Sequence, residues 1–554
     1  MESKKLMNFQ ETSSSVASTS TQIIDMGDMS KWNSRNVISP LKVAKPEVYE
    51  IDDLLPKIGG FGRFQFMIQM IFTFACAPEA CHALIMYFAA AIPPWSCVAN
   101  STNCTSSETF SSNDRTRCEL PRDQWEYRAE KTYSIVTQFD LDCTNEWMAH
   151  ASSSVFYLGT ALGAIVWGFF ADNYGRKTVM LPAFFFLQVF SLMVAFSPNI
   201  YVVIFFRFMS GFCAPACGVN MNTMLSELVV PKHRAWSCAL MFISWPIALG
   251  SVSFLAYVIP NWKYLVFAIT LPNIPVFVAM IFVPESVRWL LVHGKKEKAM
   301  EVLKKTAKVN RVPFPDNAIL KAIPNQRVSS PADLFRTLDY AILTSIQGLT
   351  WFTIAVGFYG IALASNDLTS GSKYINFLLT CLMEFPGVLI CATSLEHLGR
   401  KTSITSFLLC GGVCLLCVAG IPNIVEVHIL RLSFGMFGRC CFSVVYAGIY
   451  VWTLELYPTV LRSQAMGFMN TVAKVGGTAM PFIFKSLKIL SPVLPFALIG
   501  ALAILNSILL RRLPETKDKV LSDDTEDDIY RRQLEDRDRQ LLLAGNRISY
   551  VSSI

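Results

Sequence analysis

Charged residues are scarce in this chain. Asp, Glu, Lys and Arg make up only 16% of its 554 residues, whereas 53% are hydrophobic and the mean hydropathy is +0.41. So little polar surface cannot cover a soluble globule of this length, and we expect the chain to lie in a bilayer. The net charge of +7 does not indicate nucleic-acid binding, because Lys and Arg stand in short loops between apolar runs and not on one basic face.

Motifs for catalysis and for ATP use are also missing. The segment 59–62, Gly-Gly-Phe-Gly, is the approach to a helix and not a phosphate cradle, so we exclude an ATP-driven pump. The sequence has no set of nucleophile, base and orienting group and no metal-ligand spacing, so we expect no enzymatic activity, cofactor or metal. The C-x3-C-x2-C pattern at 410–417 could in principle hold an iron-sulfur cluster, but inside a lipid-buried helix we favour small buried apolar thiols. Residues 1–56 lack an apolar core region, so we expect no cleavable signal peptide.

A repeat organises the remainder. The stretch Gly168–Lys177, GFFADNYGRK, recurs 224 residues later as Thr393–Lys401, TSLEHLGRK. Three further pairs follow in the same order at offsets of up to 230: Arg207-x3-Gly211 with Arg431-x3-Gly435, Glu227…Arg234 with Glu455…Arg462, and Pro284-Glu285-Ser286 with Pro514-Glu515-Thr516. Four ordered landmarks predict a duplicated membrane unit.

Twelve apolar runs are long enough to span a bilayer. They lie near 64–92, 148–170, 179–196, 200–224, 236–259, 263–283, 339–363, 372–392, 403–420, 424–452, 464–484 and 491–510. With the repeat they predict an all-α membrane protein of twelve transmembrane helices in two pseudo-symmetric six-helix bundles. We expect these parts: a cytosolic arm at 1–60, bundles at 61–285 and 339–512, an extracellular loop at about 95–146, a central cytosolic loop with helices at 286–338 and a cytosolic tail at 513–554.

The cations predict the orientation. Most of them fall on one side of the predicted spans, which the positive-inside rule makes cytosolic, and both termini then lie inside. The set on that side comprises Arg176, Lys177, Lys232, Arg234, Arg400, Lys401, Arg462, Arg511, Arg512 and the central loop. Four lysines on the other side make the contrast imperfect: Lys263, Lys373, Lys485 and Lys488.

The predicted extracellular loop has two features that agree with this topology. It holds the only N-x-Ser/Thr sequons of the chain, at Asn100 and Asn103, which we expect to be glycosylated. In an oxidising compartment its four cysteines predict two disulfides, with three possible connectivities. They are Cys97, Cys104, Cys118 and Cys143.

Several motifs resemble one family. They are Ser134-Ile-Val-Thr-x-Phe-x-Leu-x-Cys143-x3-Trp147, GFFADNYGRK, Pro284-Glu285-Ser286-x-Arg288-Trp289, Glu455-Leu-Tyr-Pro-Thr459 and the segment Ile58–Gln65. From about Ile51 to Thr516 the chain resembles the organic cation/anion/zwitterion transporters, solute carrier family 22, of the major facilitator superfamily. It departs from the family pattern at Asn173, usually Arg, and at Val287, commonly Pro. The resemblance implies a multi-pass plasma-membrane protein that moves small organic ions by alternating access, with sodium or a proton as candidate coupling ions.

Charges at the predicted cytosolic helix ends are candidates for an inner gate, because such charges form the gate network in the family that this chain resembles. Opposite charges there could pair between helices and hold the gate shut. For each residue, the alternative of a plain positive-inside loop charge stays open. The set comprises Asp172, Arg176, Arg207, Glu227, Arg234, Glu285, Arg288, Glu396, Arg400, Arg431, Glu455, Arg462 and Glu515.

Charges deeper in the spans are candidates for the substrate site, because each costs roughly 2.5 to 3.5 kcal/mol at a helix centre and normally faces a cavity. Glu79 and His82 lie three residues apart, on one helix face, and could carry a proton or bind a cation, or lie inert near the outer mouth. The other candidate substrate-binding residues are Glu384, Arg439 and Lys474, with the aromatic residues Trp351, Phe358 and Tyr359. For the aromatic residues, ordinary packing is the competing interpretation.

Lys474 suggests which sign of ion is carried. By the resemblance, cation-transporting branches usually have Asp there, and branches handling anions or carnitine-like zwitterions usually have a base at that position or at Arg439. Two cations about 6 Å apart repel by roughly 3 kcal/mol at an effective dielectric near 20, and a substrate carboxylate would relieve this. We therefore predict organic anions or carnitine-like zwitterions. The alternatives are that Glu384 neutralises one cation as a structural pair, that the protein is an organic cation uniporter, or that it is a non-transporting receptor or scaffold.

Overall fold

The computed structural model describes residues 47–517, apart from 99–108, 111–115, 231–232, 234–236, 238–239, 316–317, 322–330, 365–371 and 423–424. Long helices dominate this part of the chain. In the first half they are α2 (Arg63–Leu84) continued by α3 (Met86–Ala89), α5 (Glu146–Tyr174), α6 (Arg176–Ala195), α7 (Ile200–Leu228), α9 (Ser244–Val258), and α10 (Trp262–Thr270) continued by α11 (Ile274–Ile281). In the second half they are α14 (Leu338–Leu363), α15 (Lys373–Leu382) continued by α16 (Glu384–His397), α17 (Arg400–Gly420), α18 (His428–Leu456), α19 (Thr459–Leu490) and α20 (Leu494–Leu510).

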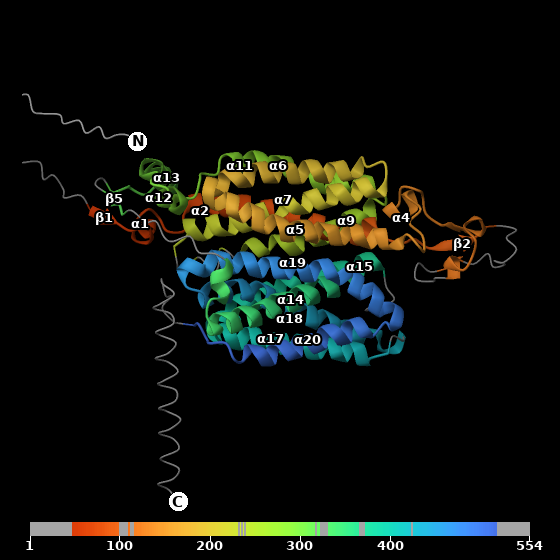
Figure 1. Ribbon diagram of the computed structural model, residues 1–554. Helices are drawn as coiled ribbons and strands as arrows, with labels where there is room; N and C mark the ends of the chain where they lie inside the picture. Colours follow the sequence, from red (N-terminus) through yellow and green to blue (C-terminus); the bar gives the residue numbers. More distant parts are fainter. Residues whose placement is uncertain are drawn as a thin grey trace, which may run out of the picture. The chain divides into compact units, whose positions relative to one another are not determined.

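Twelve membrane-crossing segments result. Ten of the described segments are long and apolar enough to cross a membrane. The 32-residue α19 is long enough but is less apolar, since it carries Asn470 and Lys474 in its interior, and α20 is a shorter apolar helix of 17 residues. The predicted all-α architecture of two six-helix bundles is confirmed, and Figure 1 shows the bundles side by side, with α5 of one next to α19 of the other.

Within the first bundle, α5 and α7 approach closely because small residues line their crossing. A Cβ atom at Gly163 would lie 2.1 Å from the carbonyl oxygen of Phe212, and one at Gly211 would lie 2.1 Å from that of Phe156. Glycine is therefore required on both helices, and the backbones pack at a distance that larger residues would prevent.

At one end of the helices, which we call the loop end, the chain between α3 and α5 forms a small domain. Its three-stranded antiparallel sheet has β2 (Trp95–Cys97) between β3 (Thr109–Phe110) and β4 (Trp125–Tyr127). The short α4 (Ile135–Gln138) follows, with Ser134 as its N-cap. Cys118 and Cys143 form a disulfide, and Cys97 is also disulfide-bonded. Cys104 and both sequons lie outside the described residues.

At the other end, which we call the charged end, short elements pack against the first bundle (Figure 1). They are α1 (Ile51–Lys57), α12 (Val287–Val292), α13 (Lys296–Asn310), and a two-stranded sheet of β1 (Glu47–Tyr49) and β5 (Ala318–Leu320). The helix α1 falls within the segment predicted to be an arm. Its Leu54 and Leu55 are buried together with Leu303 of α13, so this part of the segment is packed.

Candidate functional site

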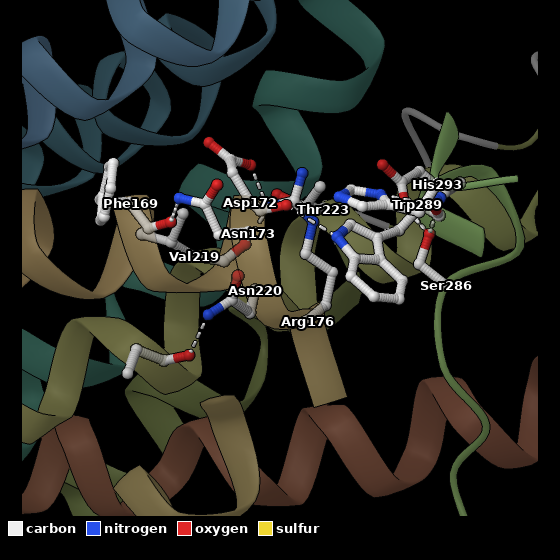
Figure 2. Close-up of polar contacts among 12 residues, drawn as sticks. Phe169, Asp172, Asn173, Arg176, Val219, Asn220, Thr223, Ser286, Trp289 and His293 are labelled. Atoms are coloured by element: carbon white, nitrogen blue, oxygen red, sulfur yellow. Dashed lines mark hydrogen bonds and ion pairs between the residues drawn. The ribbon is translucent and has the colours of Figure 1, made fainter. Parts of the chain in front are cut away.

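Asp172 and Arg176 organise the charged end of the first bundle (Figure 2). They form an ion pair across the turn between α5 and α6. The indole Nε1 of Trp289 donates to the Asp172 carbonyl oxygen at 2.8 Å, which ties α12 to the end of α5. Asn173, which replaces the usual Arg of the motif, donates to the carbonyl oxygen of Phe169 at 2.8 Å and so bonds within its own helix.

Glu285 caps the beginning of α6. One of its oxygens accepts from the backbone N–H of Lys177 at 3.1 Å and of Ser286 at 2.9 Å. The Ser286 hydroxyl in turn donates to the Glu227 carboxylate at the end of α7. A carboxylate at a helix N-terminus satisfies orphan amides and complements the helix dipole. Three elements of the first bundle are therefore joined through two carboxylates.

The second bundle repeats these contacts. Glu515 accepts from the backbone N–H groups of Arg400 at 2.9 Å and of Lys401 at 3.0 Å, at the beginning of α17. The Arg400 guanidinium makes three hydrogen bonds of 2.9 to 3.1 Å to Glu455, and the Thr516 hydroxyl donates to Glu455 at 2.6 Å. The caps by Glu285 and Glu515 and the hydroxyl bonds of Ser286 and Thr516 therefore repeat, whereas Arg176 pairs with Asp172 and Arg400 with Glu455.

A glycine with positive φ makes room for each capping carboxylate. Gly175 has φ of 112° and Gly399 has φ of 90°, and a Cβ at either position would lie 2.5 or 2.6 Å from an oxygen of Glu285 or Glu515. Burial by itself would raise the pKa of Glu515, but the backbone N–H groups that it accepts from lower its pKa below the ordinary value. This cap therefore stays ionised at physiological pH.

Two of the predicted gate residues lie elsewhere. Arg207 donates to the carbonyl oxygens of His82 at 2.7 Å and Ser152 at 3.2 Å, and Arg431 donates to that of Ile421 at 3.2 Å. Both arginines are buried near the beginnings of α7 and α18, which run from the loop end to the charged end. The prediction that they lie at the same helix ends as Asp172 is wrong, because matching repeats reveals equivalence between the halves but not depth along a helix.

The remaining predicted gate residues differ in their surroundings. Arg288 forms an ion pair with Asp52, a residue that the sequence did not single out. Glu396 is exposed near the end of α16, and Arg462 is half-buried near the beginning of α19. Arg234 lies outside the described residues. Trp289 also joins the network, although in the sequence it was only part of the family motif.

Near the middle of the two bundles, Lys474 of α19 faces Glu79 of α2. Their Nζ and Oε1 atoms are 3.7 Å apart, and their side chains are 10% and 15% exposed. A Cβ at Gly218 of α7 would lie 2.7 Å from the other Glu79 oxygen, so the missing side chain at Gly218 leaves room for this carboxylate. Among the described residues two ion pairs join the bundles. The pair of Lys474 with Glu79 lies at mid-helix, and the pair of Glu146 with Lys485, at 3.6 Å, lies at the loop end.

Arg439 belongs to a different pair within the second bundle. It forms an ion pair with Glu384, donates to the Phe358 carbonyl oxygen and lies 3.6 Å above the Phe358 ring. The side chains of Arg439 and Glu384 are 0% and 2% exposed. Both cations therefore have carboxylate partners, and the expectation of two uncompensated cations around a substrate carboxylate is wrong for this conformation. Buried charges pair because an unpaired one costs several kcal/mol.

The aromatic candidates are buried. The ring of Tyr359 lies 4.7 Å from that of Tyr157 across the interface between the bundles. Trp351 donates from Nε1 to the Thr453 hydroxyl at 3.0 Å and contacts the Tyr450 ring. His82 is buried beside Arg207, whose guanidinium donates to the His82 carbonyl oxygen.

The bundles are joined most firmly at the loop end. Lys373 donates to the Tyr133 hydroxyl at 2.6 Å, and Ser253 donates to the Tyr374 carbonyl oxygen at 2.7 Å. The rings of Phe88 and Tyr374 stack at 5.5 Å. At the charged end, within the described part of the chain, hydrogen bonds and ion pairs join helices of the same bundle only. Of the gate charges, Asp172 with Arg176 and Arg400 with Glu455 therefore pair within one bundle each in this conformation.

A duplicated six-helix unit with charged pairs at its centre defines a membrane transporter of the major facilitator fold. The family described as "Sugar (and other) transporter" matches residues 95–526. The chain is 31% identical to mouse solute carrier family 22 member 3, with 73% of each chain covered. It is 28% identical to Xenopus laevis solute carrier family 22 member 6-A, with 86% of this chain and 93% of the relative covered. A third relative is the rat organic cation/carnitine transporter 2, 31% identical over 71% of this chain and 72% of the relative.

Solved structures agree on the fold. The proton:xylose symporter XylE superimposes with a TM-score of 0.58 at 14% identity, covering 83% of this chain and 98% of that one. The human organic anion transporter MFSD10 gives a TM-score of 0.53 at 15% identity, covering 80% and 99%. The chain belongs to the sugar-and-other-transporter family and, within it, to solute carrier family 22. It is therefore a multi-pass secondary transporter of small molecules. The members of this family and fold are transporters and not enzymes.

Proposed function

We propose that this protein carries small organic zwitterions or anions across the plasma membrane by alternating access, with the charged end and both termini in the cytosol. The observation that carries the proposal is the ion pair between Lys474 and Glu79. It joins the bundles at mid-helix, its atoms are 3.7 Å apart, and both side chains retain some exposure. A pair between moving halves must part when they rock, and its charges then need other partners.

A zwitterion can replace both partners at once. Its carboxylate can bind Lys474 while its cationic group binds Glu79, so no charge is left uncompensated. A simple anion would bind Lys474 alone, and Glu79 would then need a proton or sodium ion. A zwitterion is therefore the substrate that needs no coupling ion. The name of the rat organic cation/carnitine transporter supports this class, because carnitine carries both charges.

Arg439 is not part of this proposed substrate site. Its charge is compensated by Glu384 within one bundle, and the pair is fully buried. We assign it a structural role. The aromatic side chains of Tyr157 and Tyr359, which meet across the interface, are suited to contact the organic part of a substrate.

The contacts between the bundles support an inward-facing conformation. Under the proposed orientation the loop end is extracellular, and there Lys373, Ser253 and Phe88 bridge to the opposite bundle. Two pairs of proposed cytosolic gate residues, Asp172 with Arg176 and Arg400 with Glu455, lie within one bundle each. Opening of the outer side would then require the loop-end contacts to part.

A second candidate is an organic cation transporter, because Glu79 could bind a cation once Lys474 has moved away. Uptake assays in expressing cells separate the candidates. We expect labelled carnitine to enter in a saturable manner, nearly independent of pH, and p-aminohippurate to enter faster at acidic external pH. Tetraethylammonium should not enter above background. Entry of tetraethylammonium alone would overturn the proposal in favour of the cation transporter, and entry of no organic ion by surface-expressed protein would favour a receptor or scaffold.

A further inference from the structure

Lys373 is one of the four lysines that stand against the positive-inside pattern, and it lies at the loop end, at the beginning of α15. Its Nζ atom donates to the Tyr133 hydroxyl at 2.6 Å and lies 5.1 Å and 5.0 Å from the ring centres of Tyr133 and Tyr374. In the described part of the chain no Asp or Glu forms an ion pair with Lys373. The partners that the structure describes for this half-buried cation are therefore neutral.

The contact between Lys373 and Tyr133 joins the two bundles. Tyr133 precedes α4, and the chain on both sides of it is bonded to Trp262 of α10. The Trp262 backbone N–H donates to the Thr132 carbonyl oxygen at 3.2 Å, and its indole Nε1 donates to the Gln138 side chain at 2.9 Å. Tyr133 is therefore fixed to the first bundle, whereas Lys373 begins a helix of the second. If the bundles rock, the two side chains separate and the cation needs another partner.

A small cavity lies next to this contact. Its wall includes the rings of Tyr133, Tyr374, Phe88 and Trp262, and it has room for about one water molecule. A larger molecule would therefore need Tyr133 to move away before it could reach Lys373. A carboxylate would then bind the ammonium group more strongly than the tyrosine hydroxyl does, because a hydrogen bond between two charged groups is stronger than one to a neutral acceptor.

We propose that Lys373 binds the carboxylate of the substrate at the outer mouth, where the carboxylate replaces the Tyr133 hydroxyl and the Tyr374 ring contacts the organic part. A ligand that binds only the separated state shifts the equilibrium toward that state, so binding at Lys373 opens the outer side. This outer site is distinct from the pair of Lys474 and Glu79 at mid-helix, which the substrate reaches afterwards. It rests on the proposed function for the extracellular position of the loop end and for a substrate that carries a carboxylate.

Initial rates of carnitine and p-aminohippurate uptake at matched surface expression give the first test. We expect Lys373→Gln to raise the external KM about fivefold and Lys373→Arg to change it less than about twofold. Tyr133→Phe removes only the competing hydroxyl and should lower KM about twofold. The matched control is Lys131→Gln, which removes an exposed lysine of the same segment and should keep the KM of the wild type. An unchanged KM in Lys373→Gln overturns the outer site and leaves the proposed function standing.

Labelling of Tyr133→Cys on intact cells with a membrane-impermeant thiol reagent tests binding without transport. The new thiol stands beside Lys373, so external carnitine or p-aminohippurate should slow labelling about threefold, whereas choline, which has no carboxylate, should not. Tyr133→Cys/Lys373→Gln should label at the same rate with and without these acids. Protection that survives the second substitution, or no protection of Tyr133→Cys, overturns the outer site. Protection that depends on Lys373 in a protein that transports no organic ion supports the site and overturns only the proposed function.

Discussion

Arg439 and Lys474 are both cations in membrane helices of the second bundle, but their carboxylate partners come from different places. Arg439 pairs with Glu384 of its own bundle, in full burial and with a carbonyl oxygen and an aromatic ring as further partners. Lys474 pairs at 3.7 Å with Glu79 of the other bundle, and both side chains keep some exposure. A pair inside a rigid bundle can stabilise that bundle, whereas a pair between bundles would have to part if the bundles rock as we propose.

The largest effect is expected from breaking the pair inside the bundle. Arg439→Ala leaves Glu384 buried without its cation, which costs about 3–5 kcal/mol, so we expect misfolded protein and loss of surface delivery. Thermal unfolding and surface biotinylation measure this. The double variant Arg439→Met/Glu384→Leu removes both charges and should recover much of the lost stability. Normal folding of Arg439→Ala with only a changed KM would instead place Arg439 in the substrate site.

Glu79→Gln should destabilise the protein less than Arg439→Ala does, but it should change which substrates are transported. The pair is largely buried, but the glutamine amide oxygen can still accept from Lys474, so we expect the free energy of unfolding to fall by about 1–3 kcal/mol. Carnitine uptake should fall at least tenfold, while p-aminohippurate uptake should persist and lose its dependence on external pH, because no carboxylate remains to take up a proton. The charge-swapped Glu79→Lys/Lys474→Glu keeps the pair and serves as the stability control. Unchanged carnitine kinetics in Glu79→Gln would contradict a role of the pair of Glu79 and Lys474 in substrate binding.

The gate contacts should affect rate and not affinity. Asp172→Asn weakens the ion pair with Arg176 far from the proposed substrate site, so we expect kcat to fall about tenfold with KM within about twofold. Arg400→Gln in the second bundle should have a similar effect, because Arg400 occupies the position of Arg176 in the repeat and is held by Glu455. Counterflow and surface-normalised initial rates measure both. A rise in KM at unchanged maximal rate would mean that these residues contact substrate.

The smallest effect is expected at the anchor of α2, the helix that carries Glu79. Asn310 of α13 donates to the carbonyl oxygen of Ile58 at 2.9 Å and accepts from the backbone N–H of Phe64 at 2.8 Å. A Cβ at Gly62 would lie 2.5 Å from the Asn310 side chain. Asn310→Ala should lower the free energy of unfolding by about 1 kcal/mol and change KM for carnitine less than twofold. The same substitution at the exposed Asn173, which bonds within its own helix, is the control and should change neither.

Sequence reasoning recovered what depends on periodicity and repetition. Twelve apolar runs and four repeated landmarks were enough for the helices and for the equivalence of Arg176 with Arg400, because span length and like sequence report local structure directly. The sequence did not predict how far along their helices Arg207 and Arg431 lie, because a repeat does not show in which direction a helix crosses the membrane.

Contacts between distant segments were also out of reach. Glu79 was grouped with His82 because residues three apart share a helix face, whereas its partner Lys474 is in the other bundle and only the packing of α2 against the second half reveals it. The pairing of Glu384 with Arg439 was one of two open interpretations, and the structure decides it by geometry.

The central claim is that Lys474 and Glu79 together form the ion site between the bundles. Uptake of labelled carnitine and tetraethylammonium by wild type and by Lys474→Asp, at matched surface expression, tests it most directly. We predict that the wild type takes up carnitine and excludes tetraethylammonium, and that Lys474→Asp, which sets two carboxylates facing each other, abolishes carnitine uptake and admits tetraethylammonium. Wild-type uptake of tetraethylammonium that Lys474→Asp leaves unchanged would contradict the account.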